Sequence, residues 1–185
     1  ENVDTDQLIP ARFMSRSRAE GYGGFLLYDL RFGEGGMPLG FVLDDPRFTG
    51  APVLIARRNF GTGSSREAAI YALWDYGIRC VIAPSFGDIF TANAVKNGLL
   101  PVVLPQEVVE SLLAASGACP ALTIDLASQT VQAGGAAYRF SIDPVRRLQL
   151  LNGWDDLDLT LRHADAITAY RSRQVKAQPW RFPGG

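Results

Sequence analysis

The chain has 185 residues, of which 47% are hydrophobic and 20% charged, a balance typical of a globular chain that buries one core. Its formal net charge of −1 excludes a strongly basic surface and argues against a dedicated nucleic-acid or anionic-membrane binder. Two cysteines and one histidine are too few for a disulfide framework, for a multi-histidine metal site, or for a zinc or iron–sulfur site held by cysteines alone.

Residues 1–50 show no regular hydrophobic period and are rich in turn-forming residues. The glycine-rich segments 21–24 and 33–36 predict mobile loops. Between them, residues 25–28 fit either a strand or a helix.

From residue 52 onward, short apolar runs bounded by turns alternate with segments of helical period. The runs 52–56, 79–83 and 100–104 predict three buried strands. Three helices are expected to follow them, from Ser64 or Ser65 to Tyr76, from Ser85 to Asn97, and from Pro105 to Ala115. Strand and helix repeated three times predict an α/β fold with parallel pairing and right-handed crossovers.

The remainder of the chain predicts a β-pair and then helices. Residues 122–126 and 137–142 alternate as strands do, with two glycines in the connection. Residues 144–175 have a helical pattern whose apolar stripe is marked by Ala164, Ile167 and Tyr170, and the tail 178–185 is expected to be peripheral. Since no segment looks like a linker, we expect one domain over residues 1–185.

The two cysteines also bear on the compartment. Cys80 lies in the apolar run 80–83, so we expect a small buried hydrophobe. With no apolar span of membrane length and no signal peptide, the sequence predicts a protein of the reducing cytoplasm. The chain opens at Glu1 without Met, which indicates a trimmed start.

The stretch most suggestive of chemistry is Asn-Phe-Gly-Thr-Gly-Ser-Ser-Arg-Glu at residues 59–67, between a predicted strand and a predicted helix. Ligands of open α/β sheets gather at the carboxyl ends of strands, glycines let backbone approach a ligand, and a helix start attracts anions. Ser64 and Ser65 supply hydroxyls, and Arg66 supplies a guanidinium matched to a carboxylate. The stretch therefore predicts an anion site.

Other interpretations of this stretch stay open. Ser64 and Glu67 also fit an ordinary capping box, and both interpretations hold if Ser65 caps the helix while Ser64 points outward. The stretch lacks the Gly-Lys-Ser/Thr of a phosphate-binding loop and the Gly-x-Ser-x-Gly of a nucleophile elbow. A serine hydrolase would have to use His163, with Asp165 as the acid near it in sequence.

Three ordered blocks resemble the small subunits of 3-isopropylmalate dehydratase, which are the separate swivel domains of the aconitase family. The blocks are Asn-Val-Asp-Thr-Asp-Gln-Leu-Ile-Pro at residues 2–10, the stretch 59–67, and residues 77–90 continued at 97–101. The resemblance is close over residues 2–105 and weaker beyond. It implies a single α/β swivel domain with a mixed or parallel sheet flanked by helices, in which residues 1–50 select the substrate and residues 143–185 form a C-terminal helical part.

The resemblance also implies a function and a set of site residues. Members of this family are hydro-lyases that interconvert 2-isopropylmalate and 3-isopropylmalate by dehydration and rehydration in leucine biosynthesis. The small subunit is active only with a large subunit, which carries a [4Fe–4S] cluster on three cysteines, so this chain is expected to bind no cofactor itself. By motif position, Ser64 resembles the base, Ser65 and Arg66 resemble substrate-carboxylate ligands, Asp6 an assisting carboxylate, and Arg18 a further carboxylate clamp.

Departures from the family pattern leave the substrate open. Thr62 stands where many relatives have Cys, Ala68 where many have His or Gln, and residues 19–21 replace a more basic pattern. Another short hydroxy-dicarboxylate is therefore an alternative substrate, and a non-catalytic dicarboxylate-binding module is an alternative function. The expected partners are a cluster-bearing large subunit, in a heterodimer or larger assembly, and a small hydroxy-dicarboxylate, with no nucleic acid and no membrane.

Overall fold

Three short strands form a parallel sheet in the order β1–β2–β3 in the computed structural model, which describes residues 1–117 and 121–182. Cys80 in the central strand aligns with Val53 on one side and Leu100 on the other. The strands are β1 (Val53–Ile55), β2 (Cys80–Ala83) and β3 (Leu100–Val103), and the helices that follow them are α3 (Glu67–Tyr76), α4 (Asp88–Lys96) and α5 (Gln106–Ser116). The α/β fold with parallel pairing is confirmed.

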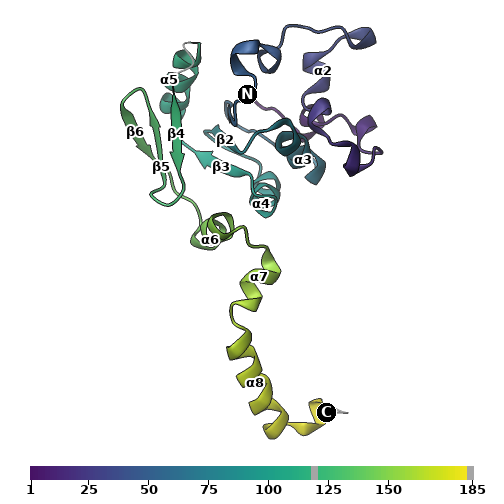
Figure 1. The fold of residues 1–185 in the computed structure, drawn as a ribbon, viewed down its shortest axis with the longest axis vertical. Coiled ribbons are helices and arrows are strands. Elements are labelled where there is room, and N and C mark those ends of the chain that lie inside the picture. Colours follow the sequence, from purple (N-terminus) through teal and green to yellow (C-terminus); the bar gives the residue numbers. More distant parts are fainter. Residues whose placement is uncertain (118–120, 183–185) are drawn as a thin grey trace.

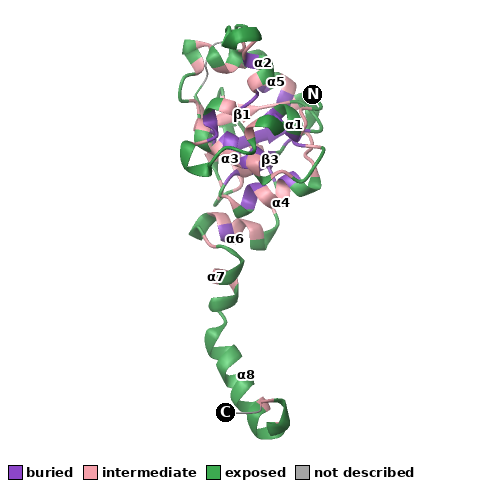
Figure 2. Ribbon diagram, turned by 90° about the vertical axis from the view of Figure 1, so that its right-hand side faces the viewer, coloured by how far each residue is buried: buried purple, intermediate pink, exposed green. Residues whose placement is uncertain are grey.

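Both faces of this sheet are covered, as expected for a parallel sheet. Successive side chains of a strand point to opposite faces. Val81 and Ala83 pack in a cluster with α3, α4 and the N-terminal segment, whereas Cys80 and Ile82 pack in a second cluster with α5 and later strands. All four residues of β2 are buried, and Figure 2 shows the buried residues gathered around the sheet. The burial predicted for Cys80 is confirmed, and Cys119 lies outside the described residues.

A second sheet is antiparallel, in the order β4–β5–β6. Its strands are β4 (Leu122–Asp125), β5 (Thr130–Ala133) and β6 (Ala136–Arg139). The predicted β-pair was wrong in its pairing, because β5 lies between the two expected strands and bonds to both. β5 contains only one buried residue, Val131, so its sequence carries too weak a pattern to reveal a strand. Gly134 and Gly135, with φ of +56° and +83°, turn β5 into β6.

The first 50 residues contain two short α-helices and a series of single 3₁₀ turns. The helices are α1 (Thr5–Leu8) and α2 (Tyr28–Arg31), and the turns are Ala11–Phe13, Arg18–Glu20, Gly23–Phe25, Glu34–Gly36, Val42–Asp44 and Pro46–Phe48. Residues 25–28 thus belong to a turn and a helix and not to a strand. The segment 21–24, predicted to be a mobile loop, is packed in this structure, because Gly23 is buried against α3. A Cβ atom added there would lie 2.7 Å from the backbone of Asp75.

The C-terminal part is helical, as predicted, and most of it leaves the rest of the molecule. Helix α6 (Pro144–Asn152) packs near α4. Helices α7 (Asp156–Leu161) and α8 (Ala164–Ala177) and the 3₁₀ turn Pro179–Arg181 then extend away in Figure 1. We call residues 156–182 the arm and the described residues up to 152 the body. The apolar stripe predicted for α8 covers no core, since all of its residues are exposed or only partly buried. Of the described helices, none has the length and apolar character needed to cross a bilayer.

Candidate active site

The first ten residues run alongside the loop between β1 and α3. The Asn2 amide donates to the Arg58 carbonyl at 2.9 Å, and the Thr5 amide donates to the Thr62 carbonyl at 2.9 Å. The Gly61 amide donates in the other direction, to the Val3 carbonyl at 2.7 Å. These backbone bonds bring the first and second sequence blocks together, although more than 50 residues separate them.

Two glycines allow this loop to sit tightly against the start of α4. Gly61 has a φ of +71°, which favours glycine, and a Cβ atom added to it would lie 2.3 Å from the Phe90 ring. A Cβ atom added to Gly87 would lie 2.6 Å from the Gly61 carbonyl oxygen. Any larger residue at either position would push the loop away from the body.

A small polar network fixes the other end of the loop. Asn59 has a left-handed φ of +60°, and its side-chain amide donates to the Asn2 side-chain oxygen at 2.8 Å. The Ser85 hydroxyl accepts a hydrogen bond from the Asn59 backbone amide at 2.8 Å and donates one to the Asn59 side-chain oxygen at 3.1 Å. Ser85 was predicted to open a helix, but α4 begins at Asp88 because Ser85 is engaged with this loop.

The start of α3 differs from the predicted one in a way that matters for chemistry. The helix begins at Glu67, with Arg66 as its N-cap, and no side chain caps it. The capping-box interpretation was wrong, because the Glu67 carboxylate accepts from the Asn97 side-chain amide at 2.9 Å instead. Ser64 and Ser65 are exposed, and among the described residues nothing bonds to their hydroxyls. The amide groups and positive dipole end of α3 are therefore available to an anion.

Arg66 and Asp6 meet beside this helix start. The Arg66 Nη1 lies 2.5 Å from the Asp6 Oδ1 and 3.5 Å from the Met14 Sδ. The Arg66 side chain is 18% exposed and the Asp6 side chain 54%. Neither Nε nor Nη2 of Arg66 donates a hydrogen bond within the described chain, so both can donate to a ligand. Asp6 lies in α1, whose capping box joins Asp4 and Gln7.

Two residues near Arg66 were not singled out from the sequence. Thr5 is buried, at 3% exposure, and its hydroxyl donates to the Ser64 carbonyl at 2.8 Å. Met14 is 40% exposed and places apolar surface next to the Arg66 guanidinium. The signal for Thr5 was its place inside the Asp-Thr-Asp block, whereas nothing in the sequence marked Met14.

Arg18 does not join this cluster. Its guanidinium forms two hydrogen bonds with the Asp75 carboxylate, one of them at 2.8 Å, and lies 4.5 Å from the centre of the Tyr71 ring. Asp75 is nine residues beyond Arg66, so it is about 13 Å further along the helix axis at the rise of an α-helix. The Asp75 carboxylate also accepts from the Tyr22 amide at 2.7 Å. In this structure Arg18 therefore fastens the 18–22 segment to α3.

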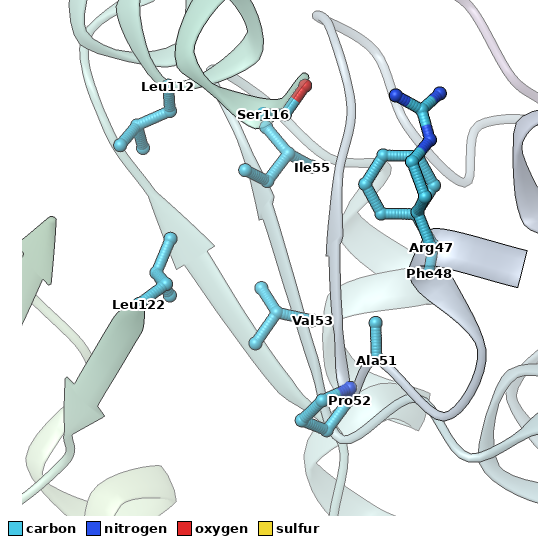
Figure 3. Close-up of a pocket in the computed structure, with 9 residues that line it drawn as sticks. All are labelled: Arg47, Phe48, Ala51, Pro52, Val53, Ile55, Leu112, Ser116 and Leu122. Atoms are coloured by element: carbon cyan, nitrogen blue, oxygen red, sulfur yellow. The ribbon is translucent and has the colours of Figure 1, made fainter. Parts of the chain in front are cut away.

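An apolar pocket lies elsewhere, along the free edge of β1 (Figure 3). Its volume is about 240 Å³, and it is lined by Arg47, Phe48, Ala51, Pro52, Val53, Ile55, Leu112, Ser116 and Leu122. Arg47 is its one cationic residue, and the Arg47 guanidinium pairs with the Asp45 carboxylate at 2.6 Å. Since a dicarboxylate needs cationic groups to replace its hydration, the apolar pocket is a poor candidate for the anion site.

The described side chains of this chain do not form a metal site. Within residues 1–117 and 121–182, no three His, Cys, Asp or Glu side chains come together to hold a metal ion. Burial raises the pKa of the Cys80 thiol far above its usual range, which disfavours the thiolate that a metal requires.

The serine-hydrolase alternative fails on geometry. His163 precedes α8 in the arm, whereas Ser64 precedes α3 in the body (Figure 1). A base must come within hydrogen-bonding reach of its nucleophile, so Ser64 and His163 cannot form a triad in this structure.

Comparisons with known proteins agree with the resemblance seen in the sequence. The profile of the Aconitase C-terminal domain matches residues 1–107, and a second profile, for the C-terminal domain of the 3-isopropylmalate dehydratase small subunit, matches residues 156–184. The chain is also 51% identical over 183 residues to the 3-isopropylmalate dehydratase small subunit of Rhodospirillum centenum. That match covers 97% of this chain and 90% of the relative. The chain belongs to the family of 3-isopropylmalate dehydratase small subunits.

A solved structure supports the fold of this small-subunit family member. The crystal structure of 3-isopropylmalate dehydratase (leuD) from Methanocaldococcus jannaschii matches with a TM-score of 0.60 at 23% identity, over 91% of each chain. The predicted aconitase-type fold and family are thus confirmed for this small subunit. The individual roles of Ser64, Ser65, Arg66, Asp6 and Arg18 stay predictions.

Proposed function

We propose that this chain is the small subunit of a 3-isopropylmalate dehydratase and that it supplies Ser64 and Arg66 to a cavity completed by a large subunit. The observation that carries the proposal is the start of α3. There, two unbonded serine hydroxyls, an uncapped helix end and a partly buried guanidinium are presented together. These groups favour an anionic substrate with a proton to be removed.

Arg66 would stabilise the charge that develops during the reaction. Removing a proton from the carbon next to a carboxylate moves negative charge onto that carboxylate. The free Nε and Nη2 of Arg66 can hold its two oxygens, and this interaction strengthens as the charge grows. The Ser65 hydroxyl, next in sequence, is placed to donate to the same carboxylate.

Ser64 would take the proton. As the Ser64 alkoxide accepts it, the C–H electron pair forms a carbon–carbon double bond and the hydroxyl on the neighbouring carbon leaves as hydroxide. In the rehydration step hydroxide adds to the carbon that lost the proton and Ser64 returns its proton to the other carbon, which moves the hydroxyl between the two carbons. A serine is a poor base unless its alkoxide is stabilised, and the helix dipole of α3 together with Arg66 favours that form.

Asp6 and Thr5 would position these groups. The Asp6 carboxylate holds Nη1 of Arg66, which restrains the guanidinium beside the start of α3. The buried Thr5 hydroxyl fixes the peptide of Ser64. Arg18 is a clamp only if it leaves Asp75, so its role as a substrate ligand requires a rearrangement of the 18–22 segment.

The departing hydroxyl needs a Lewis acid, and the described part of this chain has no side-chain set that fits one. The [4Fe–4S] cluster expected in the large subunit supplies that chemistry when bound. The small subunit alone should therefore bind dicarboxylates weakly and turn none over.

Reconstitution tests the proposal. The chain is mixed with a separately purified large subunit from the same organism, and isomerisation of 2-isopropylmalate is followed. We expect turnover in the mixture and none from either subunit alone. Activity restricted to another hydroxy-dicarboxylate would reject isopropylmalate as substrate, and submillimolar dicarboxylate binding by the isolated chain without turnover in the mixture would favour a binding module.

A further inference from the structure

The arm leaves apolar side chains in solvent. Helix α8 has no buried residue in its 14 positions, and Figure 2 shows exposed residues along α7 and α8. Six large apolar or aromatic side chains of the arm are exposed, namely Leu157, Leu161, Ile167, Tyr170, Val175 and Trp180. A run of exposed apolar side chains of this kind marks an interaction surface.

The first residues of the arm are bonded to the body, so the arm projects from the body at a defined point. The Asp156 carboxylate accepts from the side-chain amide of Gln149, a buried residue of α6, at 3.0 Å and lies 3.6 Å from the Lys96 ammonium. Asp155 caps α7 through two backbone amides. These contacts give the helices beyond them a defined starting point.

The two matched family profiles divide the chain in an informative way. Residues 1–107 match a domain that is named as the C-terminal domain of a longer enzyme, aconitase, whereas residues 156–184 match a region that is named for the small subunit alone. A domain in a longer chain is held near its neighbours at a high effective concentration by the covalent tether. A separate subunit lacks the tether and must obtain the same proximity from its own interface.

The size and charge of the arm suit such an interface. A stable protein–protein interface uses about 20–30 residues on each side, and one face of residues 156–182 can supply a substantial part of that number. The second half of the arm carries Arg171, Arg173, Lys176 and Arg181, none of which pairs with an acidic side chain elsewhere in the described chain. The matching surface is therefore apolar at its centre and acidic beside it.

We propose that the arm is the element by which this chain binds its large subunit, with Ile167 and Tyr170 of α8 as central contacts. These residues lie three apart and share one face of the helix. The inference rests on the proposed two-subunit function, but it concerns affinity and not chemistry. It assigns the body to catalysis and the arm to assembly.

Paired charge substitutions in the full-length chain test this assignment. In the test variant Ile167→Glu is combined with Tyr170→Glu. In the matched control Ala169→Glu is combined with Ser172→Glu, which has the same spacing and adds the same number of carboxylates on the opposite face of α8. The Kd for the large subunit is measured by calorimetry, turnover is measured at saturating small subunit, and circular dichroism checks helix content.

We expect the test variant to raise the Kd at least tenfold and the control to change it less than twofold. Turnover at saturation should stay within twofold of the unsubstituted chain, which separates this inference from failure of the catalytic proposal. An unchanged Kd for the test variant would overturn the inference. A loss of self-association with an unchanged Kd for the large subunit would reassign the arm to contacts between copies of this chain.

Discussion

Helices α3 and α8 both have amphipathic sequences, but they differ completely in what covers their apolar residues. In α3, Ala69, Ile70, Ala72 and Leu73 are buried, and the helix start is held in place beside Asp6. In α8 no residue is buried. An apolar stripe therefore predicts that a helix face is covered, but it does not tell whether the cover belongs to the same chain. The apolar side chains of the body are buried within this chain, whereas those of the arm are left exposed for a partner.

The largest expected effect concerns chemistry at the start of α3. Substituting Arg66→Gln removes the guanidinium while keeping an amide of similar reach, and we expect kcat/KM of the reconstituted enzyme to fall about 100- to 1,000-fold. Arg139→Gln in β6, an exposed residue of the body, is the control and should leave kcat/KM unchanged. Equal losses in both variants would show that the effect is not specific to the helix start.

The contrast between the two helices can be measured with one isoleucine-to-alanine substitution in each helix. Ile70→Ala in α3 removes a fully buried side chain, and we expect the free energy of unfolding to fall by about 3 kcal/mol. Ile167→Ala in α8 removes a side chain that is 47% exposed, and the change should stay below about 0.5 kcal/mol. Urea unfolding of both variants provides the measurement. A large loss for Ile167→Ala would mean that the arm is covered by the body in solution.

Positioning by Thr5 should have a smaller effect. Thr5→Val keeps the shape of the side chain but removes the hydroxyl that bonds to the Ser64 carbonyl, and we expect a loss of stability of about 1 kcal/mol with a larger relative fall in kcat than rise in KM. Thr5→Ser retains the hydroxyl and should recover most of kcat. If the two variants behave alike, the hydroxyl does not position Ser64.

The smallest effect is electrostatic and lies far from the arm. Hydrogen bonds from Arg47 lower the pKa of the Asp45 carboxyl from 3.8 to about 2. Between about pH 2 and pH 4 the unfolded chain binds more protons than the folded chain. The contribution of Asp45 to stability is therefore present above about pH 4 and is lost as the pH falls toward 2. Asp45→Asn should lower Tm slightly at pH 7, and the difference from the unsubstituted chain should shrink below pH 4. A difference that grows on acidification would contradict this sign.

The sequence predicted those parts of the fold whose pattern comes from burial within the chain. The runs at 52–56, 79–83 and 100–104 became β1, β2 and β3 because both faces of the parallel sheet are covered. Strand β5 was missed because one buried Val131 among exposed and partly buried residues gives no alternation that can be recognised.

The roles of the site residues stay predictions, but the sequence could point to residues in one local motif more easily than to contacts between distant segments. Ser64, Ser65 and Arg66 follow from one contiguous motif, and Asp6 was reached only through the resemblance to a family. The start of α3 was misplaced because Glu67 bonds to Asn97, thirty residues away, and no local rule contains that contact. The engagement of Arg18 with Asp75 was likewise invisible, since it joins segments 57 residues apart.

We propose that Ser64, acting as its alkoxide, removes the substrate proton in a cavity shared with the large subunit. Ser64→Ala in the reconstituted pair tests it most directly, with kcat and the Kd for the large subunit measured on the same preparation. We expect a kcat at least about 100-fold lower with an unchanged Kd. A kcat within a few-fold of the unsubstituted enzyme, at full subunit occupancy, would contradict it.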